Sequence, residues 1–325
     1  GIGPRHGEGE GDALTDHDFL SRHLKFSDLA NTSEILNRGF ISTSDQGEVV
    51  LIAPTVTNEG TIEVEQGNIV LAAGQSVTVS SLSYDAIEFE VQAPEHKAVN
   101  LGELVTKGGS VGVFAGSIEN RGVVSANAIS VDEAGNISFV AKADNVHSDA
   151  LVTAVGKNGK GGKIEILGDR VGVFGDTLVD ASGRKGGGEI LVGGDFQGKG
   201  DVPAATTTQV GAEARLRADA VVEGDGGKVI VWADDYTLFY GMAIAKGGLR
   251  LGDGGFMEIS GKNSLAFDGM VDLSAVNGLS GTVLFDPRDI TIQTIDPISV
   301  ITDPVDFLDF GASADVEISA IAITN

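Results

Sequence analysis

Gly227-Lys228-Val229-Ile230-Val231 is one copy of the five-residue pattern that decides the fold of this chain. In the pattern, a glycine is followed by apolar residues two and four positions later, and nine copies define the repeat. The other copies begin at Gly47, Gly67, Gly109, Gly135, Gly162, Gly188, Gly255 and Gly281. Because alternate residues of a β-strand point to opposite faces, each copy predicts a strand with one apolar face.

The copies recur at a short period. Successive glycines are separated by 20, 42, 26, 27, 26, 39, 28 and 26 residues, which indicates a repeated unit of 20–28 residues. We interpret the interval of 42 as two units and the interval of 39 as one unit with an insertion. Repetition at this period predicts a solenoid.

A second motif keeps phase with the first. The pattern Asn-x-Gly-x-Ile/Val begins at Asn37, Asn58 and Asn120, and the last two asparagines lie 11 residues after a repeat glycine. Asn and Gly suit corners because both tolerate positive φ, and stacked asparagines are expected to hydrogen-bond between adjacent coils. Several strands per unit, joined by such corners, predict an all-β chain that folds as a parallel β-helix. The general preference of β crossovers predicts that it is right-handed.

The strand pattern also predicts which side chains form the core. Four intervening residues, Gly112, Ser138, Glu165 and Glu258, are expected to face outward. The inward-facing set comprises Val49, Leu51, Ile69, Leu71, Val111, Val113, Ile164, Ile166, Val229, Val231, Met257 and Ile259.

Composition narrows the class of protein. The 325 residues include 47 glycines but only seven prolines, which excludes collagen and a proline-rich linker. Aromatic residues make up 6% and hydrophobic residues 42%, as expected for narrow coils filled with aliphatic side chains. With 47 acidic and 22 basic residues, the net charge of −25 argues against binding of nucleic acid phosphates. There is no cysteine and no apolar run long enough for a membrane-spanning helix.

The breaks in the repeat define the expected organisation. Residues 1–30 are predicted to be an N-terminal tail and cap-like segment, and residues 31–292 a β-helix with a loop insertion at 193–226. Residues 293–325 are expected to be a linker followed by further β-structure or an assembly strand. The chain opens with Gly rather than Met and without the apolar core of a signal peptide, so we expect upstream sequence to be missing.

Candidate catalytic groups are few. Paired carboxylates can cleave polysaccharides by acid–base chemistry, and the acidic and basic residues considered for this role are Asp234, Asp235, Asp253, Asp268, Asp272, Arg250 and Lys262. Each also fits a solvated corner or an outward strand position. Trp232 has two interpretations, a platform for sugar stacking and a side chain packed beneath a loop. We predict no catalytic, metal-binding or cofactor-binding residues, because the five histidines are scattered and the acidic residues show no repeated calcium-ligand pattern.

Several stretches carry a family resemblance. Residues 14–20 (LTDHDFL), 37–39 (NRG), 47–54 (GEVVLIAP) and 71–74 (LAAG) are one set. Residues 226–234 (GGKVIVWAD), 252–262 (GDGGFMEISGK) and 286–292 (DPRDITI) are a second. Together they resemble filamentous haemagglutinin-like exoproteins of two-partner secretion systems, in the region just after the secretion domain. The family's upstream Asn-Pro-Asn motifs do not occur in this chain.

The resemblance implies a secreted or cell-surface β-helix of a bacterium, exported through an outer-membrane transporter and used as an adhesin. Expected partners are that transporter and a receptor on a host cell, a neighbouring cell or the extracellular matrix. We therefore expect an extracellular structural or adhesive rod or fibre, and the alternative is a polysaccharide-degrading enzyme on the same fold. Strand-like residues at the extreme C-terminus predict end-to-end self-assembly by strand addition, and the alternative is that the chain is one piece of a longer rod.

Overall fold

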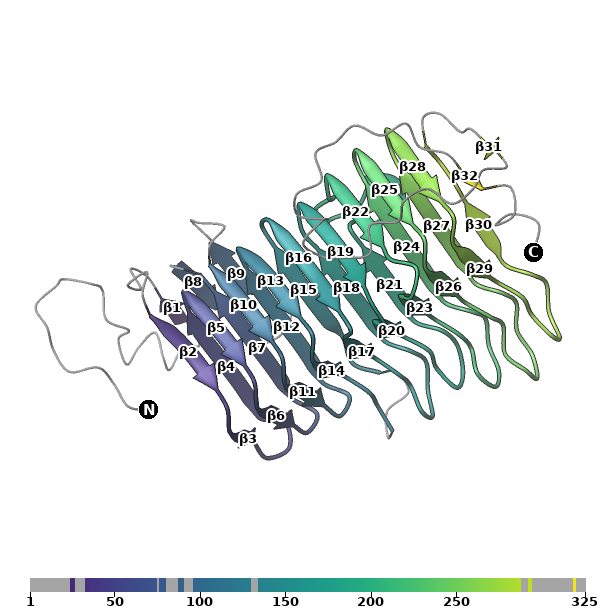
Figure 1. Ribbon diagram of the computed structural model, residues 1–325. Helices are drawn as coiled ribbons and strands as arrows, with labels where there is room; N and C mark the ends of the chain where they lie inside the picture. Colours follow the sequence, from purple (N-terminus) through teal and green to yellow (C-terminus); the bar gives the residue numbers. More distant parts are fainter. Residues whose placement is uncertain are drawn as a thin grey trace, which may run out of the picture.

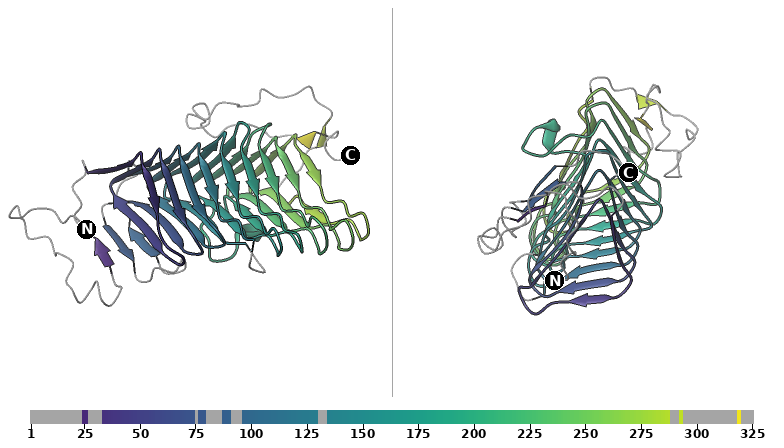
Figure 2. Two further views of the ribbon diagram at one scale, coloured as in Figure 1. Left: turned by 90° about the horizontal axis from the view of Figure 1, so that it is seen from below. Right: turned by 90° about the vertical axis from the view of Figure 1, so that its left-hand side faces the viewer.

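The computed structural model describes residues 24–26, 33–74, 76–79, 87–90, 96–129, 134–287, 292–293 and 318–319. Most of the predicted N-terminal cap and of the C-terminal tail lies outside these residues, as do His6, His17 and His23. Within them the chain winds into a stack of coils with a triangular cross-section (Figures 1 and 2). The predicted parallel β-helix is therefore confirmed. No helix in this part of the chain has the length and apolar character needed to cross a membrane.

Each coil supplies one strand to each of three parallel sheets, here called sheets 1, 2 and 3. Sheet 1 consists of β2 (Glu34–Asn37), β5 (Thr55–Asn58), β10 (Lys97–Asn100), β13 (Ser117–Asn120), β16 (Asp144–Ser148), β19 (Arg170–Phe174), β22 (Thr207–Val210), β25 (Tyr236–Phe239), β28 (Ser264–Phe267), β32 (Ile318–Ser319) and β31 (Ile292–Gln293).

Sheet 2 consists of β3 (Phe40–Ser42), β6 (Thr61–Val64), β11 (Glu103–Thr106), β14 (Val123–Ser125), β17 (Leu151–Thr153), β20 (Leu178–Asp180), β23 (Arg215–Arg217), β26 (Met242–Ile244) and β29 (Met270–Asp272). Sheet 3 consists of β4 (Glu48–Ala53), β7 (Asn68–Ala73), β12 (Ser110–Ala115), β15 (Ile137–Ala141), β18 (Lys163–Leu167), β21 (Glu189–Val192), β24 (Lys228–Ala233), β27 (Phe256–Gly261) and β30 (Thr282–Leu284). The nine copies of the glycine pattern are the nine strands of sheet 3.

Strand register corrects one interpretation of the repeat spacing. Ile69 pairs directly with Val111, so the interval of 42 residues is a single coil with an insertion and not two coils. The insertion carries β8 (Ser76–Val79) and β9 (Ile87–Glu90), which form an antiparallel sheet with β1 (Leu24–Phe26). The interval happens to be about twice the shortest coil, and spacing alone does not distinguish an inserted hairpin from a second coil.

The second long interval is a single coil with an insertion, as predicted, because Ile190 pairs directly with Val229. The insertion is shorter than the predicted 193–226. Strands β22 and β23 lie inside that range and pair with the coils on both sides. The excursion from the coil lies between β21 and β22, in residues 193–206, and we call these residues the flank loop.

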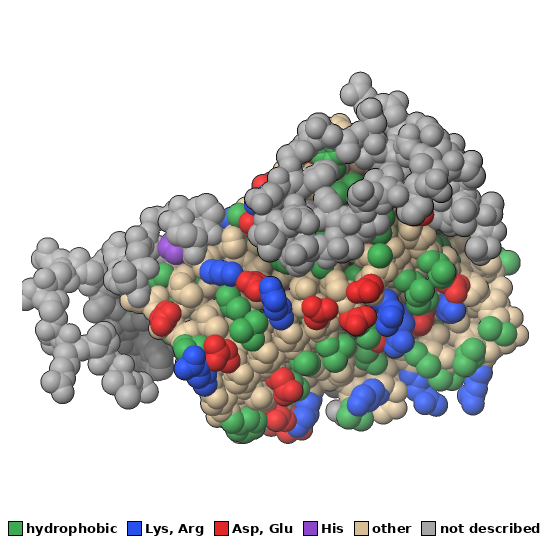
Figure 3. Space-filling view, viewed as in Figure 1, with side chains coloured by type: hydrophobic (Ala, Val, Ile, Leu, Met, Phe, Trp, Pro, Cys, Tyr) green, Lys and Arg blue, Asp and Glu red, His purple; other side chains and the backbone are tan. Residues whose placement is uncertain are grey.

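The predicted core is largely confirmed. All the residues predicted to point inward are buried in one continuous apolar cluster except Leu51, which is partly buried and packs against it. The four intervening residues point to the outer face of sheet 3, as predicted, but all four are buried there, with Ser138, Glu165 and Glu258 at most 7% exposed. Glu165 is engaged there by Ser138 and Lys163, and Glu258 by the backbone of Gln197 in the flank loop. Charged and apolar side chains are interspersed over the rest of the visible surface (Figure 3).

A column of amides runs along the inner face of sheet 1. Asn37 donates to Asn58 (2.8 Å), Asn58 to Asn100 (2.9 Å) and Asn100 to Asn120 (2.9 Å). The predicted asparagine ladder is thus confirmed, with Asn100 as a member that the motif missed because Leu104, not Ile or Val, follows it at the motif's last position. Asn120 then donates to Nδ1 of His147 (3.1 Å), where the ladder continues into an imidazole.

Candidate functional site

The outer face of sheet 3 changes character along the rod. In the first coils it is apolar, with Val70, Ala72 and Phe114 buried together. In the middle coils it is polar. In the later coils, beneath the flank loop, this face is apolar again, and Leu191, Ile230 and Trp232 form a buried cluster.

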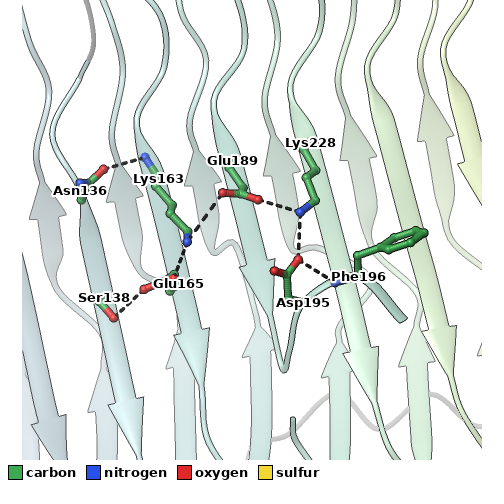
Figure 4. A network of polar contacts seen from close by, with 8 residues as sticks. All are labelled: Asn136, Ser138, Lys163, Glu165, Glu189, Asp195, Phe196 and Lys228. Atoms are coloured by element: carbon green, nitrogen blue, oxygen red, sulfur yellow. Dashed lines mark hydrogen bonds and ion pairs between the residues drawn. The ribbon is translucent and has the colours of Figure 1, made fainter. Parts of the chain in front are cut away.

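The polar part is a set of ion pairs that crosses from coil to coil (Figure 4). Ser138 donates to Oε2 of Glu165 (3.1 Å), and Nζ of Lys163 lies 2.7 Å from the other oxygen of the same carboxylate. Burial acts to lower the pKa of Lys163, but the hydrogen bond from the ammonium to Glu165 and the charges of Glu165 and Glu189 raise it above its ordinary value. The buried carboxylate of Glu165 is therefore compensated on both oxygens, as a charge out of water requires.

The same set of ion pairs, here called the ion ladder, reaches the flank loop. Glu189 lies 3.7 Å from Lys163 and 2.8 Å from Nζ of Lys228, and Lys228 also contacts Asp195 at 2.9 Å. Asp195 in turn accepts the backbone N–H of Phe196 (2.6 Å). Burial acts to raise the pKa of Asp195, yet the hydrogen bonds from Lys228 and Phe196 lower it below its ordinary value. The ion ladder thus holds the beginning of the flank loop against sheet 3.

Trp232 supplies the second anchor of the flank loop. Its side chain is only 4% exposed and packs with Val202 and Ala204 of the loop. At Gly198, in the 3₁₀ turn Phe196–Gly198, a Cβ atom would lie 2.7 Å from Cε2 of Trp232, and φ is +62°. Glycine is therefore required there for two separate reasons. The interpretation of Trp232 as a residue packed beneath a loop fits this structure, and an exposed stacking platform does not.

A groove of about 410 Å³ opens beside this anchor. Gln197 spans it, donating from Nε2 to Asp286 (3.3 Å) and accepting at Oε1 from Nζ of Lys199 (2.8 Å). The groove is lined by Gln197, Gly198, Lys199, Trp232, Asp234, Lys262, Asp286 and Pro287. It therefore presents two carboxylates and two ammonium groups to a polar ligand.

Glu258 lies next to the groove, beneath Gln197. Its side chain is fully buried, and Oε2 accepts the backbone N–H of Gln197 (2.9 Å), while Oε1 has no hydrogen-bond partner among the residues that the structure describes. Burial raises the pKa of this carboxyl group, and the Gln197 N–H and the Ser260 hydroxyl oppose that rise. A carboxyl group with one orphaned oxygen takes up a proton more readily than an exposed one.

The candidate catalytic residues do not converge on one site. Only Asp234 and Lys262 line the groove. Asp235 accepts from Asn263 (2.6 Å), and Asp253 accepts the backbone N–H of Leu279 (2.7 Å) at a different corner. Asp268 and Asp272 line a different hollow, at the last coils, where Asp272 pairs with Lys246 at 2.6 Å. Arg250 is exposed at the corner before β27.

The two described histidines are isolated from each other. His96 precedes β10, and His147 is buried inside the coil, where its ring packs edge-on against Phe139 at 4.5 Å. Among the described residues, no group of three or more His, Asp or Glu side chains is placed to hold a metal ion.

Sequence reasoning did not single out the flank-loop contacts. Glu165 and Glu258 were predicted only to face outward, and Gln197 was not considered. A signal was present, however, because Val50, Leu191 and Ile230 occupy the same intervening positions and make those strands continuously apolar. Such runs are typical of strands buried on both faces.

Comparison with known proteins agrees with this geometry. No family model and no curated protein sequence matches the chain. Its structure is similar to the crystal structure of the HMW1 secretion domain from Haemophilus influenzae, with 34% sequence identity and a TM-score of 0.72. The similarity covers 83% of this chain and 72% of that domain.

A likeness of this extent defines a class. The chain belongs to the family of β-helical proteins of two-partner secretion that the HMW1 secretion domain represents. The sequence resemblance placed the chain just after a secretion domain, whereas the HMW1 structure is itself that of a secretion domain.

Proposed function

We propose that this chain is part of an extracellular bacterial protein that an outer-membrane transporter exports by the two-partner route. The observation that carries the proposal is the 34% identity to the HMW1 secretion domain over 83% of the chain. The transporter is accordingly its first partner, and the cell surface or the medium its destination. Membership of the filamentous haemagglutinin-like branch is part of the same proposal and rests on the motifs in residues 226–292.

The second part of the proposal is an adhesive role. The coils form a continuous stack whose corners are tied by backbone hydrogen bonds, which gives a stiff rod. On this rod the flank loop is held by the Lys228–Asp195 ion pair and by Trp232, so that the groove is a preformed feature of the surface. A receptor on a host cell, a neighbouring cell or the matrix would bind this flank.

Self-assembly through the C-terminal strand needs a modified mechanism. Strand β32 pairs with β28 of its own chain, with Ile318 opposite Phe267. Exchange of β32 between two chains would therefore have to displace this pairing. We retain end-to-end assembly as a proposal in which β32 first leaves its own sheet.

Export provides the direct test. The full exoprotein containing this chain is expressed in a Gram-negative host with and without its outer-membrane transporter, and the medium, cell surface and periplasm are probed with antibody. We expect the protein outside the cell only when the transporter is present. Equal amounts outside the cell in both strains, or retention in both, would refute the proposal. A passenger protein of an unrelated export pathway serves as the control for leakage.

A further inference from the structure

The corners between sheets 2 and 3 are short in the first three coils and longer in all later ones, where they form an exposed edge. In the first coil this corner spans residues 43–47, whereas between β26 and β27 it spans residues 245–255. The last three of these corners carry large aliphatic side chains that are 47–75% exposed. They are Val221, Leu249, Leu251, Val276 and Leu279. Together with the two preceding corners they make up what we call the corner ridge.

The preceding corners carry positive charge. Lys157 and Lys160 lie on one coil, Arg184 and Lys185 on the next, and Arg250 stands between Leu249 and Leu251; all five cations are exposed. In the described part of the chain, none of these five forms an ion pair. Figure 3 shows basic and hydrophobic side chains next to one another along the lower edge of the molecule. This local character opposes the net charge of −25 for the whole chain.

Acidic groups on the same corners are partly engaged. Asp225 accepts the backbone N–H of Asp253 (2.8 Å), and Asp253 accepts that of Leu279 (2.7 Å). Both carboxylates are therefore directed into the corner backbone. Glu223 is the remaining exposed acid of the last three corners.

The corners are rigid, so the aliphatic side chains cannot fold back into the core. Backbone hydrogen bonds join each corner to the next: Arg184 donates to Gly156 (2.9 Å), Val221 to Gly183 (2.8 Å), and Arg250 to Val222 (2.8 Å). At Gly183 a Cβ atom would overlap the backbone of the neighbouring coil. The exposure of the ridge is thus built into the fold.

We propose that the corner ridge docks edge-on to an anionic phospholipid bilayer. Exposed aliphatic tips next to unpaired cations are the combination that binds the boundary between acyl chains and charged headgroups. Neighbouring coils are about 4.8 Å apart, so the five corners from Lys157 to Leu279 extend over roughly 19 Å, a line that a flat surface can meet. Acidic groups on the other faces are screened beyond about 8 Å at physiological salt.

A protein partner fits this feature less well. A stable protein interface buries about 800 Å² on each partner, which a single convex edge supplies only to a deep complementary groove. A bilayer needs no such complement.

Vesicle sedimentation tests the proposal with the complete purified chain. One set of vesicles contains phosphatidylcholine alone, and a second contains phosphatidylcholine and phosphatidylglycerol in equal parts. Two ridge variants are compared with wild type: a triple variant with Leu249→Ser, Leu251→Ser and Leu279→Ser, and a quadruple variant with Lys157→Gln, Lys160→Gln, Arg184→Gln and Lys185→Gln. We expect wild type to bind only the anionic vesicles. Each ridge variant should need at least about tenfold more lipid for half-maximal binding.

Matched controls keep the result specific to the ridge. Phe40→Ser with Leu151→Ser removes exposed apolar groups of sheet 2, and Lys199→Gln with Lys262→Gln removes cations of the groove. Both controls should bind like wild type, and all variants should keep the wild-type melting temperature because the replaced side chains are exposed. Failure of wild type to bind anionic vesicles, equal binding to both vesicle types, or unchanged binding by both ridge variants would overturn the proposal.

Discussion

The asparagine ladder makes a quantitative prediction about stability. In the middle of the ladder, Asn100 is 3% exposed, accepts from Asn58 and donates to Asn120, each at 2.9 Å. Replacing it by Ala removes both bonds at about 1 kcal/mol each, and the lost volume adds up to about 1 kcal/mol more. The orphaned partners keep other contacts, since Asn58 also reaches the carbonyl of Gly60 (3.2 Å) and Asn120 accepts from the N–H of Gly122 (3.3 Å). We therefore expect Asn100→Ala to lower the free energy of unfolding by about 2–3 kcal/mol.

Asn37 is the matched control because it stands at the end of the same ladder. It makes one ladder bond, to Asn58, and is 8% exposed. Its other bond, from the N–H of Gly39 (3.1 Å), belongs to an exposed residue that water can serve instead, so Asn37→Ala should cost about 1 kcal/mol. Urea unfolding followed by circular dichroism measures both variants, with midpoints compared directly because solenoids can unfold in steps. Equal losses for Asn37→Ala and Asn100→Ala, or no measurable loss for Asn100→Ala, would refute the idea that position in the ladder sets its contribution.

Four further predictions concern other parts of the rod. Ile166→Asp places an unpaired charge in the core and should lower the free energy of unfolding by several kcal/mol, so an unchanged melting temperature would disprove the inward register. Burial lowers the pKa of His147 to about 3 from an ordinary 6.5. The folded state then binds fewer protons than the unfolded state, so stability falls as the pH drops through 6.5 towards 3; in thermal melts His147→Asn should show a shallower loss, and identical pH profiles would contradict this. Gly198→Ala should displace the flank loop from Trp232 and shift its fluorescence towards the red, whereas Lys199→Ala should leave the spectrum unchanged; an unshifted Gly198→Ala spectrum would show that the loop tolerates the side chain. Finally, pectin and alginate should not be depolymerised with or without calcium, and reproducible cleavage abolished by Asp235→Asn would establish the enzyme alternative.

The periodic parts of the fold could be predicted from the sequence because each coil repeats the same physical requirement. Residues such as Val111 and Ile137 occupy equivalent positions, and the register pairs them as the glycine spacing implies. The inserted hairpin was missed because its length matches a whole coil. An interval between two glycines carries no information on whether the intervening strands join the stack.

The candidate site could not be predicted in the same way, since it depends on what covers the outer face of one sheet. Glu165 and Glu258 occupy positions that solvent would reach if the rod were bare. Glu165 is instead paired within the ion ladder, and Glu258 is enclosed by the flank loop. Contacts such as that from Gln197 to Glu258 join residues 61 positions apart and follow no repeat. The position at which the flank loop packs on sheet 3 is set by its contacts around Trp232. A strand pattern does not encode these contacts.

The amide column also explains how the strands of the first coils keep their register. A one-residue slip would turn a ladder asparagine towards the outer face and an outward residue into the core, which breaks two hydrogen bonds for each coil moved. After His147 the same column continues through Val173 and Val210 to Phe239 and Phe267. The rings of Phe239 and Phe267 stack with their centroids 5.5 Å apart and their planes at 7°, so ring stacking replaces hydrogen bonding in this part of the column. Register is therefore fixed by directional polar groups in the early coils and by ring packing in the late ones, with the neutral imidazole of His147 at the transition.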